Sequence, residues 1–271
     1  MAAGDDPAYG TVKTLILEYT IEGKHMTATG TDPETIDFAS PAGAEPPCEL
    51  HGDRLTAMQP GEFTLIRANG KKTQITVPAI PSPMEIKGLW QVTFPPRIGA
   101  PETITLDRLI SLSEHPDPGV KYFSGTATYH TSFDVPKSLL AEGRSINLDL
   151  GDVQVMAQVT LNGKALGILW KPPFAVDMSD ALRVGRNDLE IKVTNLWISR
   201  MIGDEQLAED SDRNPNGTLK SWPQWLTDGK PSPTGRHTFT SWRMWKKDDA
   251  LPKSGLLGPV TLRSALELPI K

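Results

Sequence analysis

The most constraining feature of this sequence is a strict alternation of apolar and polar residues between positions 187 and 195. Leu189, Ile191 and Val193 fall on one side of an extended chain, and charged or polar residues fall on the other. Successive side chains of a β-strand point to opposite faces, so this pattern predicts a strand that buries one face and exposes the other. The turn sequence GRN precedes it at 185–187. Strands of this kind bury their apolar faces by stacking sheet on sheet.

Shorter patterns of the same kind recur along the chain, and turn residues separate them. Asn162-Gly163 is the dipeptide most typical of a two-residue hairpin turn. A short helix is expected at 137–142, but no helix long enough to connect parallel strands. The expected strands lie at 54–58, 62–68, 72–77, 85–94, 102–106, 124–135, 145–150, 153–161, 165–169, 174–178, 187–195, 235–242 and 258–263, after two strands within 11–28 on either side of Glu22-Gly23. The predicted fold class is therefore all-β, with an antiparallel β-sandwich of the jelly-roll type.

The proline-rich stretch at 78–83 indicates a division between two domains. It places three prolines in six residues, and proline fixes φ and removes a backbone donor, so the stretch is a stiff linker. We expect a small N-terminal β-domain at 1–80, with a loop at 29–47, and a larger galactose-binding-like sandwich at 84–271. A chain of 271 residues is long enough for two domains.

Composition excludes several classes of function. The net charge of −5 gives no basic surface for nucleic acid or for an anionic membrane. No apolar run approaches the roughly 18 residues of a membrane span. The single cysteine, Cys48, rules out an intramolecular disulfide and any zinc site built on cysteines. The first ten residues do not resemble a signal peptide, and they could equally lie within a longer protein.

Tryptophan is concentrated near the end of the chain. Five of the seven tryptophans lie between Trp197 and Trp245. Two interpretations are open: a core cluster beneath a long loop, or a platform on which the C–H faces of a sugar stack while Arg and Asp hydrogen-bond its hydroxyls. Arg200 and Asp204, four residues apart, could equally form an internal ion pair that pins the loop. The candidate carbohydrate-binding residues are Trp197, Arg200, Asp204, Trp242, Arg243 and Trp245.

The sequence assigns no catalytic residue, no metal ligand and no cofactor. The carboxylates are plentiful, but glycoside hydrolysis needs two of them on opposite sides of one sugar, and the sequence places no such pair. A calcium loop at 210–217 is a weaker alternative, since Asp212, Asn214, Asn216 and Gly217 match the first half of an EF-hand loop. Its twelfth position is Pro223, where the pattern needs a bidentate Glu.

Several stretches together resemble a known family. They are KYFSGTATYHTSFDVP at 121–136, LNGKALGILWKPPFAVDMSDALRVGRNDLEIKVTN at 161–195 and LWISRMIGDEQ at 196–206. Residues 84–265 resemble the C-terminal β-sandwich of family 106 glycoside hydrolases, which are α-L-rhamnosidase-like. The succession is also similar to the sugar-binding domains of family 2 hydrolases and to galactose-binding-like sandwiches in general.

The resemblance implies a function and a partner. Catalysis in the family takes place in a large barrel N-terminal to these domains, and this chain contains no counterpart of it. We therefore expect a non-catalytic accessory region of a rhamnosidase-like hydrolase that contacts plant or microbial polysaccharide, with such a barrel from the same gene as partner. The alternatives are a stand-alone carbohydrate-binding module and a compact hydrolase with its site on the 196–245 surface. Family members generally act on glycans outside the cytoplasm, which implies a periplasmic or extracellular location.

Overall fold

The computed structural model describes residues 14–21, 24–31, 48–51, 54–68, 70–141 and 143–270. The chain forms two compact units, Met1–Pro47 and Cys48–Lys271. In the first unit, β1 (Thr14–Ile21) and β2 (Lys24–Thr31) pair antiparallel, with Ile21 opposite Lys24. This confirms the two strands predicted around Glu22-Gly23. Those two residues, and most of the loop predicted at 29–47, lie outside the described residues.

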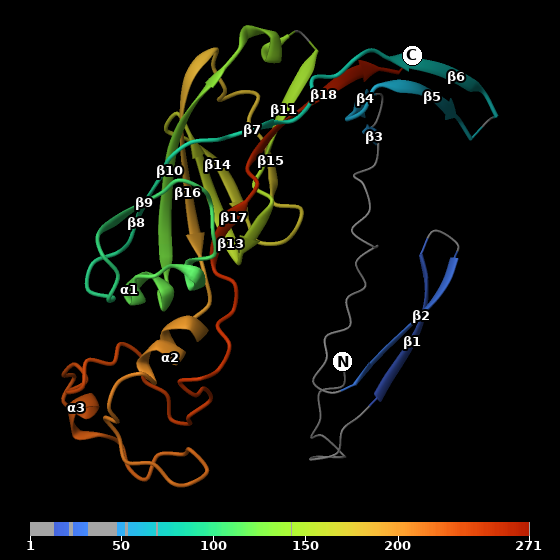
Figure 1. Ribbon diagram of the computed structural model, residues 1–271. Helices are drawn as coiled ribbons and strands as arrows, with labels where there is room; N and C mark the ends of the chain where they lie inside the picture. The colour runs from blue at the N-terminus through green and yellow to red at the C-terminus, as the bar shows by residue number, and fades with distance from the viewer. Residues whose placement is uncertain are drawn as a thin grey trace. The chain divides into compact units, whose positions relative to one another are not determined.

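The second unit is a sandwich of two antiparallel sheets, which Figure 1 shows as two layers of strands. The first sheet contains, in spatial order, β14 (Lys164–Leu169), β13 (Met156–Leu161), β16 (Gly185–Thr194), β10 (Thr126–Val135), β8 (Trp90–Thr93) and β9 (Thr103–Leu106). The second contains β15 (Ala175–Asp177), β11 (Arg144–Asp149), β18 (Thr261–Pro269), β4 (Arg54–Ala57) and β3 (Cys48–His51), and β7 (Met84–Glu85) also pairs with β18. Two smaller ribbons pair β12 (Asp152–Gln154) with β17 (Gly255–Gly258), and β5 (Gly61–Ile66) with β6 (Lys72–Val77). The predicted all-β fold class is confirmed.

Short helical segments connect or follow the strands. They are η1 (Leu112–Glu114), α1 (Pro118–Lys121), η2 (Lys137–Leu140), α2 (Ile198–Asp204) and α3 (Gln224–Thr227). The helix predicted at 137–142 is thus a 3₁₀ segment. Figure 1 places α2 at one end of the sandwich, with α3 and the rest of 205–250 beyond it. No helix in the described part of the chain is both long enough and apolar enough to cross a bilayer.

The core lies between the two sheets and takes alternate residues from each strand. The first sheet contributes Tyr129, Val159 and Ile191, and the second contributes Leu148 and Leu262, all of them fully buried. Burying a side chain of this size stabilises the fold by roughly 1.5–3 kcal/mol before entropy is subtracted. The apolar alternation in 187–195 therefore has the packing role that the sequence predicts.

Several strand predictions are wrong in part or in full. The strand predicted at 85–94 is two short strands in different sheets, because β7 pairs with β18 while β8 pairs with β9 and β10. The strand predicted at 258–263 covers the end of β17 and the start of β18. Residues 235–242, all of which the structure describes, contain no strand, and only Trp242 forms a bridge, with Thr218. The backbone N–H groups of His237 and Thr238 donate to the Asp204 carboxylate, so they are not available to a sheet. The strand predicted at 153–161 is two strands, because β12 pairs with β17 while β13 pairs with β16.

Strands from both sides of the proline-rich stretch at 78–83 join one sheet. Leu262 of β18 pairs with Met84, and further along β18, Leu266 pairs with Ala57 of β4. The compact units divide at Pro47, whereas the sequence places the boundary at the linker. Of the strands that precede the linker, β3 and β4 extend the second sheet, whereas β5 and β6 pair only with each other. The domain division at 78–83 stays a prediction.

Candidate functional site

The predicted site residues lie on α2 and on the long segment that follows it. Arg200 and Asp204 occupy successive turns of α2, with Arg200 Nε at 3.1 Å from Asp204 Oδ1. Their exposed fractions are 7% and 1%. Asp204 Oδ2 also accepts hydrogen bonds from the backbone N of His237 at 2.9 Å and of Thr238 at 2.6 Å. This geometry matches the internal ion pair that the sequence left open, and a direct role in sugar binding stays a prediction for both residues.

Arg243 belongs to a separate cluster of charges. Its Nε lies 3.2 Å from Glu205 Oε2, and its Nη2 contacts Glu209. The same two carboxylates pair with Arg236, at 2.8 Å and 3.0 Å. Arg243 and Trp245 line a small cavity of about 20 Å³ beside this cluster. A cavity of that size holds about one water molecule rather than a sugar ring.

The other predicted tryptophans present open faces. Trp197, immediately before α2, and Trp242 are each 57% exposed. Trp242 is held by a hydrogen bond from its Nε1 to the Asn216 carbonyl at 2.9 Å. Trp225 packs edge-on against Phe239, as expected of a tryptophan that orders a loop. The segment therefore has one packed tryptophan, Trp225, and two exposed ones, Trp197 and Trp242. Its role as a sugar platform stays a prediction.

The residues considered for calcium hydrogen-bond within their own turn. Asn216 Oδ1 accepts from Thr218 N at 3.2 Å and from Thr218 Oγ1 at 2.8 Å, and Asn214 Nδ2 donates to the same hydroxyl at 3.0 Å. Across the described residues, no group of three or more His, Cys, Asp and Glu side chains is placed to hold a metal ion. Calcium binding stays an untested alternative.

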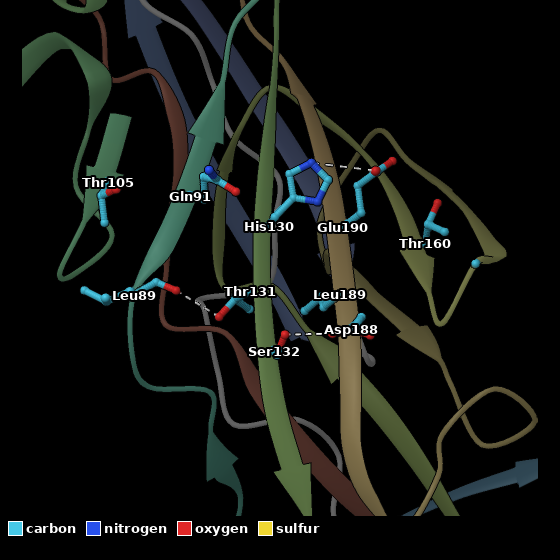
Figure 2. Close-up of a pocket in the computed structure, with 11 residues that line it drawn as sticks. Leu89, Gln91, Thr105, His130, Thr131, Ser132, Thr160, Asp188, Leu189 and Glu190 are labelled. Carbon is cyan, nitrogen blue, oxygen red and sulfur yellow. Dashed lines mark hydrogen bonds and ion pairs between the residues drawn. The ribbon is translucent and has the colours of Figure 1, made fainter. Parts of the chain in front are cut away.

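A larger concavity lies elsewhere, on the solvent-facing side of the first sheet. It encloses about 620 Å³, within the usual range for ligand sites. Figure 2 shows polar side chains from neighbouring strands projecting into it. We call this concavity the sheet groove, and its lining residues are Leu89, Gln91, Thr105, His130, Thr131, Ser132, Thr160, Gly163, Asp188, Leu189 and Glu190.

The strand register brings five of these residues into one line. Thr105 of β9 lies opposite Gln91 of β8, Gln91 opposite His130 of β10, and His130 opposite Glu190 of β16. Thr160 of β13 lies opposite Glu190 on the other side. Figure 2 shows them in this order across the strands. We call these five residues the transverse row.

The charges of the sheet groove are paired locally. The Glu190 carboxylate lies 3.8 Å from the His130 imidazole and 3.4 Å from Lys192 Nζ. Ser132 Oγ donates to Asp188 Oδ1 at 2.7 Å, and this bond, with the nearby Arg186 guanidinium, holds the pKa of Asp188 below its usual value. The groove therefore presents hydrogen-bonding groups and two carboxylates, Asp188 and Glu190, whose Arg186 and Lys192 partners lie outside its lining.

Sequence reasoning found the strands of the sheet groove but not the groove itself. Alternation places His130, Asp188 and Glu190 on outward faces. It does not say which strands are neighbours or in what register they pair. The turn at Asn162-Gly163 fixes β13 against β14 only, because a hairpin sets the register of its own two strands.

The asparagines of the stretch at 161–195 have structural roles. Asn187 is fully buried, and its amide donates to the carbonyls of Arg183 and Gly185 while its Oδ1 accepts from Arg183 N and Asn162 Nδ2. Asn195 in turn donates to the Phe123 carbonyl and to Ser254 Oγ. Asn187 thus closes the turn before β16, and Asn195 ties the end of β16 to two distant segments, so these two asparagines of the resembling stretch have structural roles.

Comparison with known proteins agrees with this fold. Residues 113–237 match the model of the glycosyl hydrolase 2 galactose-binding domain-like family. Over 208 residues, 77% of its length, the chain is 44% identical to a Formosa agariphila protein named “Putative beta-glucuronidase”. The structure of a rhamnosidase from Novosphingobium sp. PP1Y matches 95% of the chain at 26% identity, with a TM-score of 0.56.

Both relatives are much longer than the matched region. The chain spans 18% of the Formosa agariphila protein and 24% of the rhamnosidase. Residues 113–237 therefore resemble a glycosyl hydrolase 2 galactose-binding-like domain, and the chain is homologous to regions of much longer proteins.

Proposed function

We propose that this chain is the non-catalytic accessory region of an α-L-rhamnosidase-like hydrolase of family 106, and that it contacts the polysaccharide on which that enzyme acts. One observation carries the proposal: 95% of the chain aligns with only 24% of a rhamnosidase. A region that makes up about a quarter of a glycoside hydrolase supports catalysis by another part of the same polypeptide. In the proposed arrangement that other part is a barrel encoded by the same gene. A rhamnose-containing plant or microbial polysaccharide, met in the periplasm or outside the cell, is the ligand that fits this role.

The pairing of carboxylates supports a non-catalytic role. A general acid or nucleophile in glycoside hydrolysis must reach the glycosidic bond. Asp204 is buried and accepts hydrogen bonds from His237 and Thr238, and Glu205 lies between two arginines. In these positions both carboxylates stabilise the segment 205–250 and are withheld from a substrate.

A second candidate function is polysaccharide targeting by this chain alone. The exposed faces of Trp197 and Trp242 favour it, because large exposed aromatic side chains are typical of binding surfaces. Targeting needs affinity for polysaccharide without any contribution from a catalytic domain.

Two measurements on the purified chain test these functions. The first is turnover of aryl α-L-rhamnoside and aryl β-D-glucuronide. We expect none, and turnover that is abolished by substitution of one carboxylate would instead establish a compact hydrolase. The second is retention of the chain in gels that contain rhamnose-rich polysaccharide. Retention supports contact with substrate, and its absence leaves the chain a purely structural accessory.

A further inference from the structure

The sheet groove has the dimensions of an extended sugar chain. Neighbouring strands of a sheet lie about 4.8 Å apart, so the five strands of the transverse row span about 19 Å. One side chain therefore meets each interval of about 4.8 Å, which is close to the length of one sugar unit in an extended glycan. The row runs across the strands from Thr105 to Thr160, and both ends are on the surface.

The chemistry of the transverse row matches sugar hydroxyls. Gln91 offers both a donor and an acceptor, Thr105 and Thr160 offer hydroxyls, and Glu190 offers acceptors. Figure 2 shows these groups directed to the same side of the sheet. Leu89, which is exposed at the edge of the groove, adds an apolar surface for the C–H face of a ring.

The charge pattern selects among glycans. Glu190 already faces His130 and Lys192, and Asp188 already faces Arg186. No cation that lines the groove in the described structure is left to bind the carboxylate of a uronic acid, and a uronate would approach two carboxylates of like charge. An uncharged sugar is not repelled by these carboxylates.

We infer that the sheet groove is a binding site for an extended, uncharged oligosaccharide that lies across the strands along the transverse row. The inference deepens the proposed function, since it names the ligand class and the surface through which an accessory region contacts its polysaccharide. It assigns binding to residues that lie apart from the tryptophans of 196–245.

A glycan microarray and isothermal titration calorimetry test the inference on the intact chain. The array carries neutral oligosaccharides of pentoses, hexoses and deoxyhexoses in increasing length, with oligogalacturonates as the acidic comparison. We expect binding of a neutral series that strengthens with length until the row is filled, and weaker binding of the acidic series.

Matched substitutions locate the site. Gln91→Ala and Thr105→Val each remove a hydrogen-bonding group from the row and are expected to weaken binding about fivefold to tenfold. The controls Gln158→Ala and Thr103→Val change the same residue types on the exposed face of the same sheet, outside the groove. They are expected to leave the dissociation constant unchanged. All four residues are exposed, so thermal melting should stay the same and exclude misfolding as a cause.

Three outcomes overturn the inference. They are the absence of binding to every neutral oligosaccharide, tighter binding of the acidic series, and equal effects of the row substitutions and their controls. The proposed function is tested separately. If oligosaccharide binding is lost in Trp197→Ala or Trp242→Ala and not in the row variants, the chain still contacts glycan but through another surface.

Discussion

Thr238 donates two hydrogen bonds to Asp204, one from its backbone N at 2.6 Å and one from Oγ1 at 2.8 Å. The two residues are 34 positions apart, and the bonds join the irregular segment after α2 back to that helix. On its other side the Asp204 carboxylate faces Arg200. This buried carboxylate thus accepts hydrogen bonds from the backbone N–H groups of His237 and Thr238, which pair with no strand.

Replacing Asp204 should therefore unfold part of the protein. Asp204→Ala leaves the Arg200 guanidinium buried without its counter-charge and removes the acceptor for two backbone N–H groups. We expect a loss of about 3–5 kcal/mol in the free energy of unfolding, measured by urea denaturation. The control, Asp228→Ala, removes an exposed carboxylate and should not change the melting temperature. A loss below about 1 kcal/mol for Asp204→Ala would contradict this account of the segment.

Asn187 should be equally sensitive to substitution. Asn187→Ala removes a fully buried amide that satisfies two carbonyls and accepts two donors. Unfolding free energy should fall by about 2–4 kcal/mol, while Asn216→Ala, in an exposed turn, should cost less than about 1 kcal/mol. Equal losses in the two variants would show that the buried network adds nothing beyond ordinary turn chemistry.

Tyr129 predicts a loss of stability at alkaline pH. Burial raises the pKa of its phenol, against a smaller opposing effect of the hydrogen bond from Leu256 N. In the unfolded chain the phenol ionises near pH 10, whereas in the folded chain it stays protonated. The contribution of the protonated Tyr129 phenol to the free energy of unfolding is therefore complete below about pH 10 and is lost as pH rises above it. Tyr129→Phe should be less stable at neutral pH and show a shallower decline above pH 10 in denaturation curves. Parallel declines would rule out this linkage.

The exposed tryptophans predict a separate effect on polymer binding. If Trp197 and Trp242 stack on polysaccharide, replacing either with Ala should weaken retention in polysaccharide gels by on the order of 1 kcal/mol, or about fivefold. Trp170→Ala is the matched control, because Trp170 is also largely exposed but follows β14 and does not belong to 196–245. Similar losses in all three variants would point to nonspecific adhesion.

Local sequence patterns predicted much of the sandwich. The alternation in 187–195 and the Asn162-Gly163 turn each depend on residues close together in the chain, and β16 and the β13–β14 hairpin appear where expected. The strand predicted at 235–242 failed because its pattern is also local. The competing partner of its backbone, Asp204, lies more than thirty residues away and acts only in the folded state.

The transverse row could not be predicted for the same reason. Each of its residues occupies an unremarkable outward position on its own strand. Only the order β9, β8, β10, β16, β13 and the register of each pair bring Thr105, Gln91, His130, Glu190 and Thr160 together. The sequence also could not distinguish Arg200 as a ligand from Arg200 as a buried partner of Asp204, because burial depends on how 205–250 folds over α2.

The alternation along β10 and β16 also separates two kinds of evolutionary change. Tyr129 and Ile191 fill the interior, whereas their sequence neighbours His130 and Glu190 project from the opposite side. Exchanging an outward residue leaves the interior packing intact, so this scaffold can acquire new ligand preferences without a penalty in foldability. A library randomised at Gln91, Thr105 and Thr160 should accordingly yield mostly folded variants. The sheet is therefore a practical starting point for the engineering of glycan-binding proteins.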